Sequence, residues 1–112
     1  MAFDEELADR VREMLSPREG LSERRMFGGI GFMLNGNMAC GVHGDELIVR
    51  LDPADAERAL SEAHVRVFDM TGRPMKGWIL VGPDATASAE SLGAWVDAGA
   101  DHAASLPAKE RR

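Results

Sequence analysis

Cysteine is nearly absent from this chain, because Cys40 is the only one among 112 residues. A single cysteine excludes an intrachain disulfide and a metal site built from several cysteines. Long apolar runs are also missing: the strongly apolar stretches 26–34 and 78–81 are far shorter than the ~20 residues that cross a bilayer. The N-terminus is acidic where a secretory signal is basic. We therefore expect a cytoplasmic protein that does not enter a membrane.

Positive charge is in deficit, with 13 Lys and Arg against 19 Asp and Glu and a net charge of −6. This balance argues against a protein that holds nucleic acid by broad neutralisation of phosphates, although it leaves room for a local basic patch. Hydrophobic residues at 45% and charged residues at 29% are typical of a folded globular chain. The length predicts one domain over residues 1–106, followed by a flexible polar tail over 107–112.

Apolar residues spaced three or four apart predict three helices. The first runs from about Phe3 to Leu15 and ends at Ser16-Pro17, and a loop follows over residues 18–23. The second begins after Asp52-Pro53, which combine a capping side chain with a proline that suits a first helical turn. The third begins near Ser88 and continues beyond residue 100.

Alternating apolar residues predict five strands, over residues 25–34, 38–43, 46–51, 65–68 and 75–81. Asn35-Gly36 suits a type I′ turn between the first two strands, and Gly44-Asp45 suits a II′ turn before the third. The element order α-β-β-β-α-β-β-α indicates an α+β fold with its helices gathered against an antiparallel sheet.

The predicted sheet is apolar on both faces. In the last strand Trp78 and Leu80 lie opposite Ile79 and Val81. In the first strand alternation separates two sets of residues: Met26, Ile30, Phe32 and Leu34 on one face, and Phe27, Gly29, Gly31 and Met33 on the other. Helices on one side would leave apolar surface on the other, where a partner protein or a second copy of the chain could dock.

No pattern in the sequence indicates catalysis, a cofactor or a metal. The run Gly28-Gly29-Ile30-Gly31 lies within a predicted strand and not before a helix, so it does not fit a phosphate-binding loop. Cys40 and His43 form a C-x-x-H pattern, but residues three apart on a strand point to opposite faces, which favours an inert, packed cysteine. We interpret the following glycines as structural: Gly28, Gly29, Gly31, Gly36 and Gly77.

Two sequence blocks carry a family resemblance. Residues 24–36 read RRMFGGIGFMLNG and residues 70–78 read MTGRPMKGW. In this order and spacing they resemble the N-terminal domain of the TfoX (Sxy) competence regulators, over about residues 5–105. The resemblance implies a two-layer α+β domain with a five-stranded, mainly antiparallel sheet and three helices on one side.

The resemblance also implies a regulatory function. TfoX-like regulators promote expression of DNA-uptake genes together with the cyclic-AMP receptor protein, and they carry a second, helical domain. We expect this chain to be a stand-alone copy of the first domain that contacts another protein, with a transcription regulator as the partner that the family implies.

We expect the contact to use the sheet side and the loop over residues 71–77. In that loop Gly72 permits a tight turn, Pro74 stiffens the entry to the strand, and Arg73 and Lys76 offer charge-assisted hydrogen bonds to an acidic partner. The candidate partner-binding residues are Arg24, Arg25, Met26, Phe27, Thr71, Gly72, Arg73, Pro74 and Lys76.

Two other functions compete with this one. The first is direct binding of DNA by a local patch in which Arg24, Arg25, Arg66, Arg73 and Lys76 converge. The second is a small-molecule or enzyme site beneath the glycine-rich face, which predicts a concave pocket lined by polar groups and a side chain with a perturbed pKa.

Overall fold

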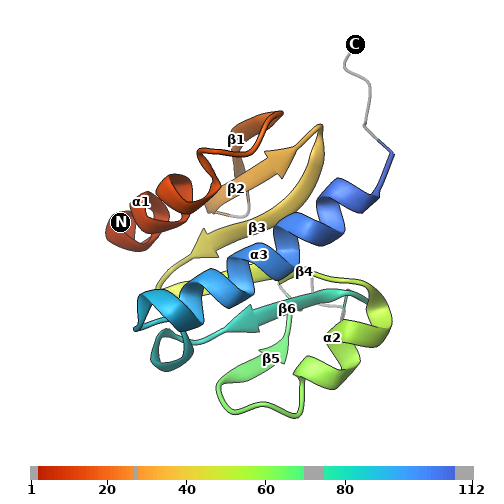
Figure 1. The fold of residues 1–112 in the computed structure, drawn as a ribbon. Helices are drawn as coiled ribbons and strands as arrows, with labels where there is room; N and C mark the ends of the chain where they lie inside the picture. Colours follow the sequence, from red (N-terminus) through yellow and green to blue (C-terminus); the bar gives the residue numbers. More distant parts are fainter. Residues whose placement is uncertain (1–2, 27, 70–74, 108–112) are drawn as a thin grey trace.

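Six strands form one sheet in the computed structural model, which describes residues 3–26, 28–69 and 75–107 (Figure 1). The strands are β1 (Leu21–Met26), β2 (Gly29–Leu34), β3 (Asn37–His43), β4 (Glu46–Arg50), β5 (Val65–Val67) and β6 (Trp78–Val81). Their order across the sheet is β1-β2-β3-β4-β6-β5, and every neighbouring pair is antiparallel. The α+β class and the antiparallel sheet predicted from the sequence are therefore confirmed.

The prediction of a single strand over residues 25–34 is wrong. Gly28 has a φ of +75° and reverses the chain, so that Met26 pairs back with Gly29 and the segment becomes the β1–β2 hairpin. The loop predicted over 18–23 contributes the start of β1. Residues 22–25 of β1 are polar and exposed at the sheet edge, so they lack the alternating apolar pattern on which strand prediction depends. The sheet of the described residues thus has six strands and not five.

The other predicted turns are present. Asn35 and Gly36 have φ values of 53° and 83°, the two positive angles that a type I′ turn requires. Gly44, at the first position of the next two-residue loop, has a φ of 59°, as a II′ turn requires. The last strand is shorter than predicted, because β6 begins at Trp78 and not at residue 75.

Three α-helices are present, as predicted. They are α1 (Glu5–Leu15), α2 (Pro53–Ala59) and α3 (Ala89–Ser105), and a short 3₁₀ helix, η1 (Pro83–Ala85), precedes α3. Side chains cap each α-helix: Asp4 accepts from two backbone amides of α1, Asp52 accepts from the amide of Ala54, and Ser88 accepts from the amide of Ser91. Within the described residues, no helix has the length and apolar character needed to cross a bilayer.

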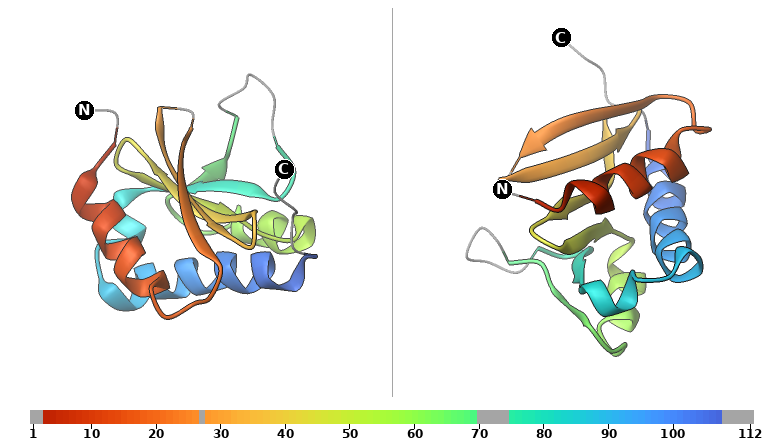
Figure 2. Two further views of the ribbon diagram at one scale, coloured as in Figure 1. Left: turned by 90° about the horizontal axis from the view of Figure 1, so that it is seen from above. Right: turned by 90° about the vertical axis from the view of Figure 1, so that its left-hand side faces the viewer.

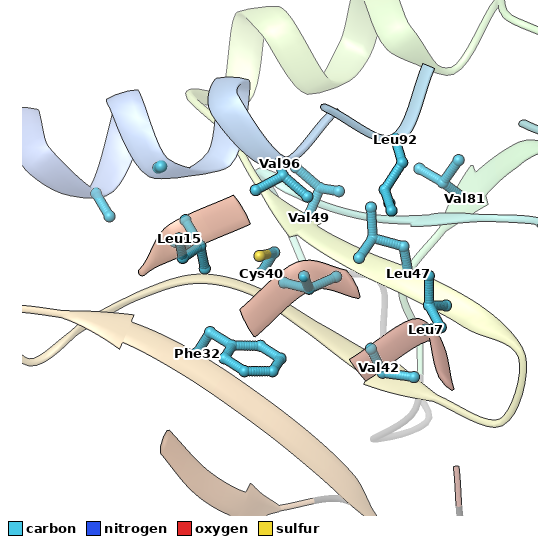
Figure 3. Close-up of a cluster of buried hydrophobic side chains, with 14 of the residues drawn as sticks. Leu7, Leu15, Phe32, Cys40, Val42, Leu47, Val49, Val81, Leu92 and Val96 are labelled. Carbon is cyan, nitrogen blue, oxygen red and sulfur yellow. The ribbon is translucent and has the colours of Figure 1, made fainter. Parts of the chain in front are cut away.

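All three helices pack on one face of the sheet (Figures 1 and 2). Figure 3 shows the centre of this main core, where α1 and α3 meet β2, β3 and β4 around the side chains of Leu15, Phe32, Cys40, Val49 and Val96. The contact of α3 with the sheet is close, because a Cβ on Gly99 would lie 2.3 Å from the carbonyl oxygen of Ala39. The predicted helix-covered face of the sheet is therefore correct.

The opposite face, which we call the second face, carries a smaller hydrophobic cluster. Met38, Ile48, Phe68 and Leu80 are buried there, and Met33, Met75 and Trp78 are partly exposed around them. The predicted alternation in the last strand is correct, because Leu80 and Trp78 belong to this cluster while Ile79 and Val81 belong to the main core. The expectation of a bare apolar face needs correction, since most of its apolar side chains are buried.

Candidate functional site

The middle of the second face is floored by glycine. Gly31 of β2 lies opposite Gly41 of β3, and Gly41 lies opposite Ile48 of β4. The side chain of Met38 lies over this floor: its methyl carbon is 2.8 Å from the position that a Cβ on Gly41 would take. The flexible thioether therefore fills the space above the glycine pair. Met38 therefore occupies the space directly above Gly41, on the face where the small-molecule site was expected.

Trp78 forms a rigid, partly exposed anchor on the second face. Its ring stacks on Phe68, with the ring centroids 5.8 Å apart and the planes inclined by 28°. The guanidinium of Arg50, which lies opposite Trp78 in the β4–β6 pairing, is 5.5 Å from the Trp78 centroid. Stacking and the cation–π contact together hold the indole in place. A fixed aromatic surface of this kind is typical of protein interfaces.

Cations border the apolar side chains of the second face. Arg24 lies opposite Gly31 in the β1–β2 register, and Arg66 lies opposite Leu80 in the β5–β6 register. Alternation along the strands places both arginines on this face, and Arg50 joins them through its contact with Trp78. Arg66 donates to the carboxylate of Glu46 at 2.6 and 3.2 Å. Lys76 is exposed, two residues before Trp78.

The helix side of the molecule has the opposite charge. The exposed carboxylates of the three helices and of the residues just before them are Asp4, Glu5, Glu6, Asp9, Glu13, Asp52, Asp55, Glu57, Glu90, Asp97 and Asp101. The fold therefore separates charge: most of the acid lies over the helices, and three arginines of the sheet, Arg24, Arg50 and Arg66, lie on the second face. The second face therefore presents positive charge on the side of the molecule away from the acidic helices.

Arg24 and Arg25 do not share a face. Arg25 turns toward α1, where its guanidinium lies 5.4 Å from the centroid of the Phe3 ring. Glu23, on the same side of β1, accepts two hydrogen bonds from Arg12 of α1, at 2.5 and 2.9 Å. The hydrogen bond from Arg12 lowers the pKa of Glu23 below its ordinary value. The predicted convergence of both arginines on one patch is thus wrong, and Arg25 instead helps to join β1 to α1.

Of the remaining predicted partner-binding residues, the structure describes two. Met26 lies in β1, paired with Gly29, and Lys76 is exposed before β6. The following predicted residues lie outside the described residues: Phe27, Thr71, Gly72, Arg73 and Pro74.

The predicted structural glycines occupy turns and close contacts. Gly28, Gly36 and Gly77 have positive φ angles, and Gly31 faces Gly41 on the second face. A Cβ on Gly29 would lie 2.1 Å from the carbonyl oxygen of Val42. Only glycine fits such a close approach.

Cys40 and His43 point to opposite faces, as predicted. Cys40 is fully buried in the main core, and burial raises the pKa of its thiol to about 12. His43 lies opposite Glu46 at the end of β3 and is partly exposed. Across the described part of the chain, His, Cys, Asp and Glu side chains form no group of three or more that could hold a metal ion.

The structure contains a cleft of about 480 Å³ that the sequence analysis did not predict. It lies between α2 and the strands β5 and β6, which Figure 1 shows side by side. Its walls come from residues 53–60 and 75–79, which are distant in sequence. Each segment by itself has the pattern of an ordinary helix or strand, so periodicity carries no signal for the cleft.

The fold defines a small α+β domain in which three helices cover one face of a six-stranded antiparallel sheet. The family model of the TfoX N-terminal domain matches residues 13–103, and the chain belongs to this family. Both sequence blocks that carried the resemblance, 24–36 and 70–78, lie within the matched range. No curated protein and no solved structure matches the chain.

Proposed function

We propose that this chain is a non-enzymatic regulatory module that binds an acidic protein partner through its second face. The observation that carries the proposal is the composition of that face: Met33, Met75 and Trp78 are partly exposed beside Arg24 and Arg50. Methionine, tryptophan and arginine are the residues that protein interfaces favour. The acidic helix side would attract the same partner less, which favours the second face as the main binding surface.

The buried polar side chains have structural roles, which supports a binding function and not catalysis. Cys40 stays a protonated thiol near neutral pH because burial raises its pKa to about 12, and a thiol in that state is a poor nucleophile. The buried side chain of Asn37 donates to the carbonyl of Pro107 and joins the start of β3 to the residues after α3, and Thr86 donates to the carbonyl of Pro83 within the turn of η1. These groups support stability and leave the partly exposed second face as the functional surface.

A protein partner fits the second face better than DNA does. Arg25 is turned toward α1, and Arg66 pairs with Glu46. Cations that are engaged in this way contribute little to phosphate neutralisation, and the net charge of −6 opposes it. Single arginines placed next to apolar side chains instead suit a partner with mixed apolar and acidic surface.

The membership in the TfoX N-terminal domain family supports a regulatory role. We propose that the partner is a transcription regulator and that the complex controls genes of DNA uptake. A genome-wide transcript measurement in the native host tests this step, comparing the wild type with a strain that lacks the gene. The proposal expects lower transcripts of DNA-uptake genes in the deleted strain. Unchanged transcripts would contradict the regulatory role.

A capture experiment tests the binding surface. The immobilised chain is exposed to extract of the native host, and the retained proteins are identified by mass spectrometry. We expect Met33→Glu, which places an acid among the apolar side chains of the second face, to reduce retention of the partner by about tenfold. The matched control is Arg58→Glu, a charge reversal on the exposed side of α2. Equal retention by wild type and Met33→Glu would contradict the proposed surface.

A titration with duplex DNA at two salt concentrations tests the competing function. The proposal expects no binding whose affinity falls steeply as the salt concentration rises. Tight, strongly salt-dependent binding that Arg24→Ala weakens would replace the protein partner with DNA.

A further inference from the structure

The cleft between α2 and β6 has the size of a binding site. Its volume of about 480 Å³ lies within the range of roughly 300–1,000 Å³ that is usual for ligand sites. Apolar side chains dominate its lining, among them Leu60 and Ala54 from α2 and its end, Val67 from β5, and Met75 and Ile79 from the other wall. Such a lining favours an apolar occupant.

Several polar backbone groups of the β6 wall are already engaged. The amide of Met75 donates to the carbonyl of Phe68 at 3.1 Å, and the amide of Trp78 donates to the carbonyl of Met75 at 3.1 Å. The carbonyl of Gly77 accepts from the amide of Leu51 at 2.6 Å. Because these groups are used inside the protein, they are not available to orient a polar small molecule, which favours an apolar side chain as occupant.

Two exposed charges of opposite sign stand at the cleft. Lys76 lies on the β6 wall, and Glu57 lies on α2. An acidic group next to the occupant would be attracted to Lys76 and repelled by Glu57. The two charges therefore orient a bound segment with its acidic residue toward Lys76. Met75 and Trp78 belong both to the cleft lining and to the second-face cluster, which makes the cleft continuous with the proposed binding surface.

We propose that the cleft is an anchor site for a short segment of the partner protein, which inserts a large apolar side chain and places an acidic residue against Lys76. This inference rests on the proposed function and adds the chemistry of the partner to it. The segment supplies the apolar contact, and the charge of Lys76 selects its acidic neighbour. Trp78, held between Phe68 and Arg50, forms a preorganised part of the wall, which reduces the entropy cost of binding.

Selection from a library of random short peptides displayed on phage tests the anchor site. We expect the selected peptides to share a large apolar residue next to an acidic one. The variant Ala54→Trp, which fills the cleft from an exposed position of α2, should weaken peptide binding by at least about tenfold. The matched control is Ala94→Trp, at an exposed position of α3 outside the cleft lining, which should leave binding unchanged. Circular dichroism confirms that both variants fold.

A charge swap tests the role of Lys76. A selected peptide is remade with lysine in place of its acid, and its affinity is measured by fluorescence anisotropy. The proposal expects Lys76→Glu to weaken the original peptide and to restore binding of the remade one. The inference is overturned if the peptides bind Ala54→Trp as tightly as wild type. It is also overturned if Lys76→Glu neither weakens the original peptide nor restores binding of the remade one.

The outcomes separate the anchor site from the proposed function. In one outcome, wild type and Ala54→Trp retain the partner from extract equally, and Met33→Glu loses it. This result overturns the anchor site and leaves the second face as the interface. A different outcome is that peptides bind the cleft and that Met33→Glu still retains the partner as well as wild type does. This outcome supports the anchor site and overturns the second face as the interface. Light scattering that shows a dimer dissociated by Ala54→Trp would identify a second copy of the chain as the occupant and overturn the inference.

Discussion

Gly77 holds the start of β6 against the end of β4. Its φ of +84° lies in the left-handed region, and a Cβ there would be 2.6 Å from the carbonyl oxygen of Leu51. Its own carbonyl accepts a hydrogen bond from the amide of Leu51. A side chain at this position would therefore meet both an unfavourable φ and a clash with the backbone of Leu51. Gly77 also lines the cleft.

The substitution Gly77→Ala is expected to lower the free energy of unfolding by about 3 kcal/mol. The matched control is Gly44→Ala, because Gly44 also has a positive φ, 59°, but a Cβ there meets nothing within 4 Å. The control should cost only about 1 kcal/mol, the conformational term alone. Urea denaturation measures both values, and equal losses would show that the clash with Leu51 has no energetic consequence.

Cys40 should resist alkylation in the folded protein. Burial raises the pKa of its thiol to about 12, so the reactive thiolate is scarce near pH 8 and the sulfur is inaccessible to reagent. Mass spectrometry after treatment with iodoacetamide should show slow modification in buffer and rapid modification in denaturant. Complete alkylation within minutes, without unfolding, would contradict the burial of this thiol in the main core.

Two glycines of α3 should respond in opposite directions to the same change. Gly99 touches the sheet, and a Cβ there would lie 2.3 Å from the carbonyl oxygen of Ala39, so Gly99→Ala should destabilise the fold by about 2 kcal/mol. A Cβ on Gly93 would meet only the methyl of Met14 at 4.0 Å. Gly93→Ala should therefore stabilise the protein by up to about 1 kcal/mol through helix propensity. Thermal unfolding of both variants checks the signs, and a Gly99→Ala variant that unfolds at the same or a higher temperature than wild type would refute the close packing of α3.

The Arg12–Glu23 ion pair joins α1 to the edge strand β1. Arg12 lowers the pKa of Glu23 from the ordinary 4.5, so this pair stabilises the fold above that pH and the stabilisation is lost as pH falls through the folded value. Because both side chains are partly exposed, Glu23→Gln should cost less than about 1 kcal/mol at pH 7. The difference between wild type and variant should vanish in acid. A difference that grows below pH 4.5 would have the wrong sign.

Local patterns predicted the helices and most strands, because capping residues such as Asp52 and Ser88 and the turn pair Asn35-Gly36 act over a few residues. The edge strand β1 was missed because its exposed residues satisfy no burial pattern. The opposite directions of Arg24 and Arg25 depend on that strand, and hence the sequence did not show that Arg25 lies away from the predicted arginine patch. The cleft was missed because it exists only where α2 meets β6.

The whole chain separates its acidic helix layer from a sheet face of methionine, tryptophan and arginine. This arrangement follows from the topology: three helices cover one face, and the described residues that form the hydrophobic cluster on the second face belong to the strands or, like Phe68 and Met75, lie close to a strand in the sequence. Figure 2 shows the helices gathered on one side of the sheet. The regulation that we propose would need no catalytic group, only a partner whose surface is complementary to the second face.

Methionine methyl groups report directly on this claim. Met33 and Met75 lie on the second face, while Met14 packs against the main core on the helix side. NMR spectra of the methyl-labelled chain should be recorded with and without the partner that the capture experiment retains. We expect the Met33 and Met75 signals to shift or broaden while the Met14 signal stays unchanged. A change at Met14 with Met33 and Met75 unaffected would contradict the second face as the binding surface.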